Sequence, residues 1–179
     1  MKNEINIASE ILSKGGIILY PSDTIWGIGC DATNFNAVSK IFKLKKRDNS
    51  KALITLVADK EEQEEITGIK NDLKFNKPTT FIYPNSNSLA KNLIASNGSV
   101  AIRIVKDKFC QNLIKKFGKP IVSTSANISG SNNPNKFSEI SKEIINNVDY
   151  IVNLRKEEIM STPSKIILLN TDGTYTKIR

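Results

Sequence analysis

The most telling stretch of this chain reads Pro120-Ile121-Val122-Ser123-Thr124-Ser125-Ala126-Asn127-Ile128-Ser129-Gly130. Its first three residues predict a buried strand, and the small hydroxyl residues that follow predict a loop that leaves the end of that strand. Open α/β sheets bind ligands in crevices at such strand ends. Small side chains allow a close approach to phosphate, and an asparagine amide both donates and accepts hydrogen bonds. A polar loop that caps the next helix has the same composition, so both interpretations stay open at this point.

Strands and helices alternate along the rest of the chain. Apolar or alternating runs predict strands over residues 17–20, 52–58, 79–83, 99–105, 120–123, 150–154, 165–169 and 174–178. Helical spacing predicts helices over residues 4–14, from Asn34 onward, over 59–65, around 109–117 and over 138–145. The alternation indicates a three-layer α/β fold, in which helices flank a twisted sheet of about seven strands. A hairpin turn at Asp172-Gly173 would make this sheet mixed, and we expect residues 1–179 to form a single domain.

The composition excludes several kinds of active site. The chain has no histidine, which removes Ser-His-Asp and Cys-His catalysis and histidine zinc sites. Cys30 and Cys110 form no Cys-x-x-Cys pair, so we expect two buried thiols and no protein metal ligands. No apolar run approaches the ~18 residues of a membrane span, and the N-terminus lacks a secretory pattern. We therefore expect a cytoplasmic protein without a membrane partner.

The chain is basic, with 26 Lys and Arg residues, 18 Asp and Glu residues and a formal net charge of +8. This balance favours anionic partners, but it does not distinguish RNA from a nucleotide triphosphate. Only residues 47, 103, 155 and 179 are arginines. Because only guanidinium presents a planar fork to a carboxylate or phosphate, these positions are the first candidates for a binding role.

A basic cluster lies near the end of the second predicted helix. It consists of Lys43, Lys45, Lys46, Arg47 and Lys51. Such a run is typical of a solvated helix end, and it also suits a phosphate cradle. Lys45 and Arg47 would diverge on a helix, whereas an extended turn after the helix could point both into one cavity. The cluster lacks the glycine-rich P-loop pattern, which argues against a Walker-type nucleotide site.

A third stretch combines a strand end, a proline turn and two glycines. It reads Tyr20-Pro21-Ser22-Asp23-Thr24-Ile25-Trp26-Gly27-Ile28-Gly29-Cys30-Asp31. The glycines allow a close backbone approach, and Trp26 could form the wall of a pocket. An ordinary turn with a core tryptophan explains the stretch nearly as well.

Taken in this order, the three stretches resemble the YrdC family of threonylcarbamoyl-adenylate synthases. The family's YPTDTVYGLGCDA turn is similar to residues 20–32, its K-x-R motif to Lys45-Lys46-Arg47, and its STSANxSG motif to residues 123–130. The resemblance covers about residues 10–179 and implies a YrdC-like fold with a central basic cavity. Longer relatives add a C-terminal domain over the active site, which we expect here to be absent or replaced by a partner.

The resemblance also implies an activity and a set of site residues. Members are nucleotidyltransferases that make threonylcarbamoyl-AMP and pyrophosphate from L-threonine, bicarbonate or CO2, and ATP, with Mg2+ as the cofactor. A tRNA threonylcarbamoyl transferase complex then uses the product to modify tRNA next to the anticodon. The implied catalytic residues are Lys45, Arg47, Ser125 and Asn127. The implied threonine-binding residues are Thr24, Arg47 and Ser164. The implied ATP-binding residues are Lys45, Lys51, Thr80, Ser123, Ser125, Asn127 and Arg179.

Two other interpretations compete with the synthase. A double-stranded RNA-binding module would suit the charge, and it predicts an RNA affinity that falls steeply with salt and no ATP turnover. Weak RNA binding could also accompany the enzyme activity. A paralogue such as YciO would share the fold without synthase activity, but that group lacks the intact K-x-R and S-x-N pairs that this chain carries. We therefore expect the synthase.

Overall fold

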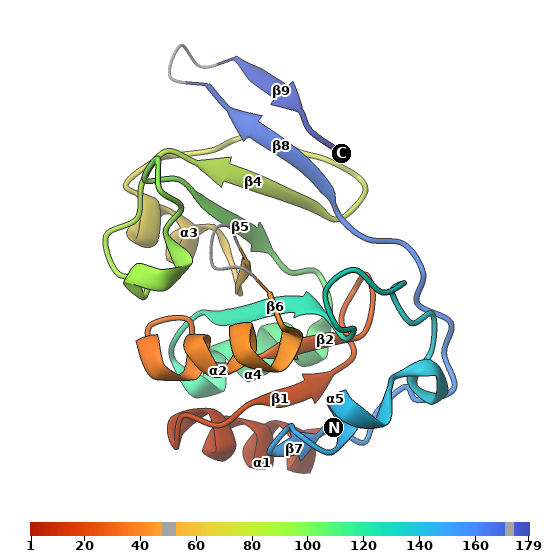
Figure 1. Cartoon of the computed structure of the whole chain (residues 1–179). Helices are drawn as coiled ribbons and strands as arrows, with labels where there is room; N and C mark the ends of the chain where they lie inside the picture. The colour runs from red at the N-terminus through yellow and green to blue at the C-terminus, as the bar shows by residue number, and fades with distance from the viewer. Residues whose placement is uncertain (48–52, 171–173) are drawn as a thin grey trace.

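A twisted sheet runs through the centre of the molecule (Figure 1). The computed structural model describes residues 1–47, 53–170 and 174–179. Within these ranges nine strands pair in the order β7-β1-β2-β6-β3-β5-β4-β8-β9. The strands are β1 Ile18–Tyr20, β2 Gly27–Gly29, β3 Ile54–Val57, β4 Thr79–Tyr83, β5 Val100–Ile104, β6 Ile121–Ser125, β7 Tyr150–Ile151, β8 Lys165–Leu169 and β9 Tyr175–Lys177. Parallel pairs such as β3–β5 and β4–β8 stand beside antiparallel ones, which confirms the mixed sheet.

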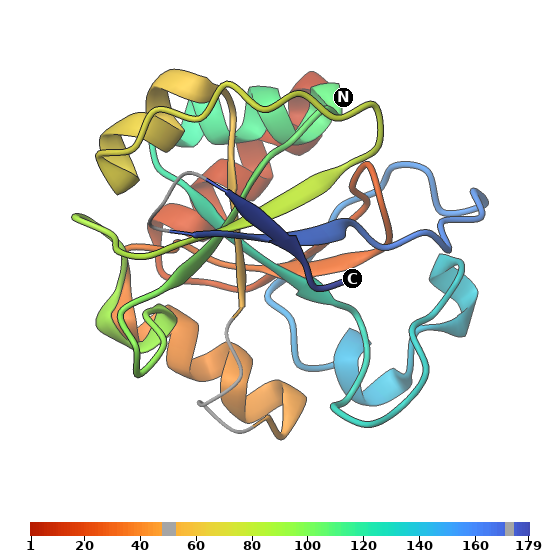
Figure 2. The same cartoon turned by 90° about the horizontal axis from the view of Figure 1, so that it is seen from above.

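Helices cover both faces of the sheet and complete the expected three layers. They are α1 Lys2–Ser13, α2 Phe35–Lys45, α3 Lys60–Thr67, α4 Lys108–Phe117 and α5 Lys142–Ile145, with 3-10 turns η1 Lys91–Leu93 and η2 Phe137–Glu139. Seen from above, α1, α3 and α4 lie on one side of the sheet and α2 and α5 on the other (Figure 2). In the part of the chain that the structure describes, no helix has both the length and the apolar character needed to cross a bilayer.

The sequence pattern explains why each helix forms and what it buries. Helix α1 buries Ile5, Ala8 and Leu12 against α4, whose own apolar face belongs to the same core cluster. Helix α2 begins at Asn34, whose side chain accepts a hydrogen bond from the Ala37 amide at 3.1 Å, as an N-cap residue does. The expected buried thiols are confirmed, since Cys30 and Cys110 are both buried and free.

The strand count is the main correction, nine in the described ranges against about seven expected. The additional strand β2 is the short segment Gly27-Ile28-Gly29, which we interpreted only as a turn. Glycine has low strand propensity, so the segment gives no strand signal. Gly29 is nevertheless required by packing. A Cβ at position 29 would lie 2.5 Å from the Val122 carbonyl oxygen and 2.7 Å from the Tyr20 ring.

The helix predicted over residues 138–145 is wrong as a single element. The chain instead forms η2, then extended backbone at Ile140, then the short α5. Ser141 interrupts a continuous helix because its side chain caps the Ile144 amide, which gives the backbone an alternative hydrogen bond. The strand predicted over 150–154 is also shorter, since β7 pairs only with Ile18 and Leu19 at the sheet edge. The turn at Asp172-Gly173 lies outside the described residues, although β8 and β9 do pair antiparallel.

Candidate active site

A cavity of about 190 Å³ opens where the central strands β3, β5 and β6 meet the turn before β2 and the C-terminus. It is lined by Thr24, Ile25, Arg47, Leu53, Ile54, Arg103, Ser123, Thr124, Ser125, Asn133, Pro163, Ser164, Ile166 and Arg179. Three of these are arginines, and none of the described lining residues is acidic. The cavity is therefore basic, as expected, and its hydroxyl groups and guanidinium groups together suit an anionic ligand.

Arg47 reaches this cavity because the chain reverses at the end of α2. Lys46 adopts the left-handed conformation, with φ 49° and ψ 42°. The Arg47 amide then donates to the Phe42 carbonyl at 3.0 Å, and the Lys46 amide donates to that of Lys43 at 3.1 Å. These two bonds form a helix C-cap of the Schellman type. The cap sends Arg47 toward the cavity, while Lys45, on the last turn of the helix, stays behind it.

Lys45 is buried at 1% exposure and holds the hydroxyl loop after β6 in place. Its ammonium donates to the Ser125 carbonyl at 2.5 Å, to the Asn127 carbonyl at 2.6 Å and to Asn127 Oδ1 at 3.2 Å. The Ser129 amide donates back to the Lys45 carbonyl at 2.9 Å. Burial, with a smaller contribution from the positive charge of Arg47, lowers the pKa of the ammonium to about 7.

The predicted tetrad does not share one cavity wall. Arg47 and Ser125 line the cavity, whereas the described lining does not include Lys45 or Asn127. Asn127 instead accepts from Ser125 Oγ at 2.6 Å and donates to the Ser131 carbonyl at 2.6 Å. Arg47 and Ser125 therefore face the cavity, while Lys45 and Asn127 fix the backbone at the end of β6, where Ser125 lies.

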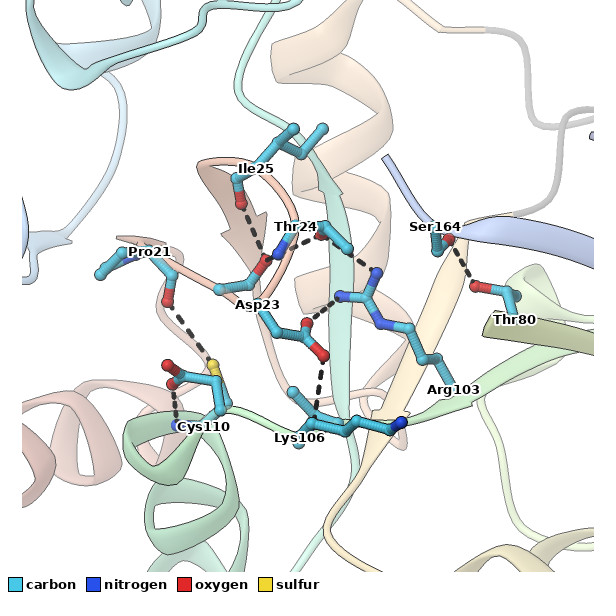
Figure 3. Close-up of polar contacts among 12 residues, drawn as sticks. Pro21, Asp23, Thr24, Ile25, Thr80, Arg103, Lys106, Cys110 and Ser164 are labelled. Carbon is cyan, nitrogen blue, oxygen red and sulfur yellow. Dashed lines mark hydrogen bonds and ion pairs between the residues drawn. The ribbon is translucent and has the colours of Figure 1, made fainter. Parts of the chain in front are cut away.

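Arg103 is an arginine of the cavity lining that the predicted site residues omit. It is 3% exposed, its Nη1 donates to Thr24 Oγ1 at 3.1 Å, and its Nη2 lies 3.2 Å from Asp23 Oδ1 (Figure 3). Ser22 braces the same turn, because its hydroxyl donates to the Ile25 carbonyl at 2.8 Å and lies 3.0 Å from Thr24 Oγ1. The scarcity of arginine already singled out position 103. Side chains alternate between the two faces of a strand, so the position of Arg103 on the strand predicted over residues 99–105 could have indicated a residue that faces the site.

A hydroxyl pair lies on the opposite side of the cavity from Thr24. Thr80 Oγ1 and Ser164 Oγ lie 2.8 Å apart, on β4 and on the residue before β8 (Figure 3). Ser164 lines the cavity, while Thr80 is fully buried behind it. Arg179 donates from Nε and Nη2 to the Ser164 carbonyl at 3.2 and 3.0 Å, which ties the C-terminal residue to this wall. Lys51, the remaining predicted ATP-binding residue, lies outside the described residues.

A mixed sheet with helices on both faces and a basic, hydroxyl-lined cavity at its centre defines an anion-binding α/β protein. The chain belongs to the Sua5/YciO/YrdC family, since it matches the family model Sua5_yciO_yrdC, described as "Telomere recombination", over residues 10–179. A similar curated protein is the threonylcarbamoyl-AMP synthase of Pseudoalteromonas translucida (strain TAC 125). It is 31% identical over 166 residues, which cover 85% of this chain and 87% of the relative.

Solved structures share the fold. The structure of P. abyssi Sua5 complexed with L-threonine matches 98% of this chain with a TM-score of 0.82 at 23% identity. The matched part is 53% of that Sua5 chain, so this protein spans about half of its length. E. coli YciO matches the whole of this chain and 89% of its own, with a TM-score of 0.83 at 24% identity. At these identities the likeness shows the fold alone.

Proposed function

We propose that this protein is an L-threonylcarbamoyladenylate synthase, a nucleotidyltransferase that forms threonylcarbamoyl-AMP and pyrophosphate from L-threonine, bicarbonate or CO2, and ATP. The observation that carries the proposal is the cavity in which Arg47, Arg103 and Arg179 meet the hydroxyls at the end of β6, with no carboxylate side chain among the described lining residues. Curated relatives with the synthase name, at about 31% identity over most of the chain, support it.

Threonine is assigned to the side of the cavity formed by Thr24, Arg47 and Ser164. The guanidinium of Arg47 can form two parallel hydrogen bonds with the amino-acid carboxylate. Thr24 lines the same wall and is held there by two hydrogen bonds. Its Oγ1 accepts from Arg103, and its proton goes to Ser22 Oγ, because the Ser22 proton is donated to the Ile25 carbonyl. P. abyssi Sua5, which shares the fold, has been solved with L-threonine bound.

ATP is assigned to the hydroxyl loop and the C-terminal wall. Ser123 and Ser125 line the cavity from the end of β6. The Ser123 hydroxyl can donate to a phosphate oxygen, while Ser125 donates to Asn127 Oδ1, and Arg179 supplies a cation beside them. Lys45 and Asn127 act by holding that loop, Thr80 acts by orienting Ser164, and Lys51 remains a proposed contact. The described lining offers hydroxyls and no carboxylate, which fits Mg2+ that arrives on the ATP phosphates with most of its waters.

The reaction then needs positioning and charge stabilisation more than a protein nucleophile. The threonine amine and bicarbonate form a carbamate with loss of water, or the amine adds to CO2 with loss of a proton. A carbamate oxygen attacks the α-phosphorus of ATP, the bond to the β-phosphate oxygen breaks, and pyrophosphate leaves. Holding threonine and ATP in one cavity makes the capture of this short-lived carbamate effectively intramolecular. The guanidinium groups offset the charge that develops on the phosphates.

The product's use and the protein's surroundings are part of the same proposal. Threonylcarbamoyl-AMP would pass to a tRNA threonylcarbamoyl transferase complex, which modifies tRNA next to the anticodon in the cytoplasm. The net charge of +8 also suits weak RNA binding beside this activity.

A reconstitution tests the function. The purified protein is incubated with ATP, Mg2+, L-threonine and bicarbonate, each omitted in turn, and the products are followed by mass spectrometry. We expect threonylcarbamoyl-AMP and pyrophosphate only in the complete mixture. Formation of no adenylate, or ATP turnover that ignores threonine, would overturn the proposal. An RNA affinity that falls steeply with salt, without ATP turnover, would favour the RNA-binding module instead.

A further inference from the structure

A second cavity, of about 400 Å³, lies on the other face of strands β4 and β5. Side chains alternate along a strand, so Thr80 and Arg103 face the candidate active site while Phe81 and Ile102 face this second cavity. The two cavities share none of their described lining residues. Nothing in the proposed reaction uses the second cavity, and its volume is within the range of small-molecule sites.

The wall of this cavity is aromatic and aliphatic. The ring of Phe75 lies 5.7 Å from that of Phe81 and 6.2 Å from that of Tyr175, measured between centroids. Leu73 and Ile104 line the cavity yet are 41% and 37% exposed. Apolar side chains that line a cavity and remain partly exposed to water contribute binding free energy when a flat apolar ligand covers them.

The rim of the cavity is cationic. Lys74, Lys77 and Lys106 line it, and its described lining contains no carboxylate. Lys106 Nζ donates to the Phe75 and Asn76 carbonyls at 2.9 and 3.4 Å, which keeps this ammonium at the rim. The nearby carboxylates of Glu64 and Asp72 are both paired with Lys60. The charge that faces the hollow is therefore positive, and it suits an anionic group on the ligand.

From the aromatic wall and the cationic rim we propose that this cavity is a binding site for a planar aromatic anion. The aromatic body packs against Phe75 and Phe81, and the anionic group meets the lysines of the rim. The proposal concerns a different cavity from the synthase reaction, so either can fail without the other.

Indole-3-acetate is a probe that carries both features. Its binding to the full chain is measured by isothermal titration calorimetry beside that of indole-3-acetamide, which lacks the negative charge. We expect the amide to bind about fivefold or more weakly, the size of one lost ion pair. Equal affinities for the two compounds, or no binding of the indole acid at millimolar concentration, would overturn the proposal.

Variants place the probe in the molecule. Phe75→Ala and Lys77→Gln change exposed or half-buried side chains of one loop, and we expect both to weaken indole-3-acetate binding while threonylcarbamoyl-AMP formation continues. Arg47→Ala, in the other cavity, should leave the affinity unchanged. Loss of binding in Arg47→Ala with retention in Phe75→Ala would place the probe in the candidate active site and refute the second site.

Discussion

At the scale of single residues, Arg47 carries the largest share of the proposed chemistry. It is half-buried at the cavity wall, and burial lowers the pKa of its guanidinium, although not enough to discharge it at neutral pH. Its position depends on the left-handed turn at Lys46, so the function of one side chain rests on the backbone of its neighbour.

The first prediction concerns Arg47→Ala. Because removing one partner of a hydrogen-bonded charge pair costs about 2–5 kcal/mol, this variant should lose roughly 10²–10³ in threonine-dependent pyrophosphate release. Lys43→Ala is the matched control, since it removes one positive charge from an exposed position on the helix that precedes Arg47. The melting temperature should stay near that of the wild type in both variants. Wild-type turnover by Arg47→Ala would refute its assigned role.

The second prediction concerns Lys45 and pH. Its pKa is about 7 in the folded protein, against an ordinary value of 10.5. Below pH 7 both states hold the proton, and above pH 7 the unfolded state holds a proton that the folded state has released. The free energy of unfolding should therefore rise with pH from about 7 upward, by at most about 1.4 kcal/mol per pH unit from this group.

Denaturant titrations of the wild type and of Lys45→Met between pH 7 and about 9 check this slope. Subtracting the two curves removes the other titrating groups, including the buried thiols, whose raised pKa values give a slope of the opposite sign. Parallel curves for the two proteins would contradict the shifted pKa of Lys45.

At the scale of elements, the sequence predicted the strands that have clear apolar runs. It did not predict the strand that forms only through its packing and pairing in the folded protein. Strand β4 and strand β8 have the predicted bounds, because β-branched and aromatic residues fill them. Strand β2 has no such signal and forms only because it pairs with β1 and β6. Arg103 shows the same limit within the site, since its contact with Thr24 depends on how the turn before β2 lies against β5.

The third prediction tests β2 directly. A methyl group at Gly29 would collide with the Val122 carbonyl and the buried Tyr20 ring, so Gly29→Ala should cost about 2–3 kcal/mol of stability. Gly27→Ala is the control, because its Cβ would lie 3.3 Å from the nearest atom, Ser123 Oγ. Chemical denaturation should separate the two variants. Equal losses would show that close packing at Gly29 is not what fixes this strand.

At the scale of the whole molecule, the candidate active site draws on distant parts of the chain. Thr24, Arg47, Ser125 and Arg179 come from nearly its full length and meet only in the folded state. Sequence motifs could therefore name most of these residues in advance. They could not show that Lys45 and Asn127 hold the end of β6 in place. This arrangement depends on the cap at the end of α2 and on three hydrogen bonds from Lys45. A single domain over residues 1–179 stays a prediction.

The fourth prediction follows from this long-range assembly. Ligands that bind only the folded chain stabilise all of it, by about 2.7 kcal/mol at a concentration of one hundred times Kd. ATP with Mg2+ and threonine together should raise the melting temperature by several degrees, and each alone should raise it less. Arg47→Ala should lose the threonine-dependent part. If threonine did not change the melting temperature of the wild type in the presence of ATP and Mg2+, the proposal of a shared cavity would be contradicted.

Strand β4 illustrates how little tolerance this architecture has for changes in chain length. Thr80 and Phe81 are neighbours in sequence, yet one supports a polar wall and the other an aromatic one on the reverse side. Adding or deleting one residue before Thr80 would exchange these roles. The Phe81 ring would then point toward the candidate active site, and the Thr80 hydroxyl would point toward the second, aromatic cavity. A substitution in β4 changes one side chain on one face of the sheet, whereas a register shift by one residue would disrupt both cavities at once.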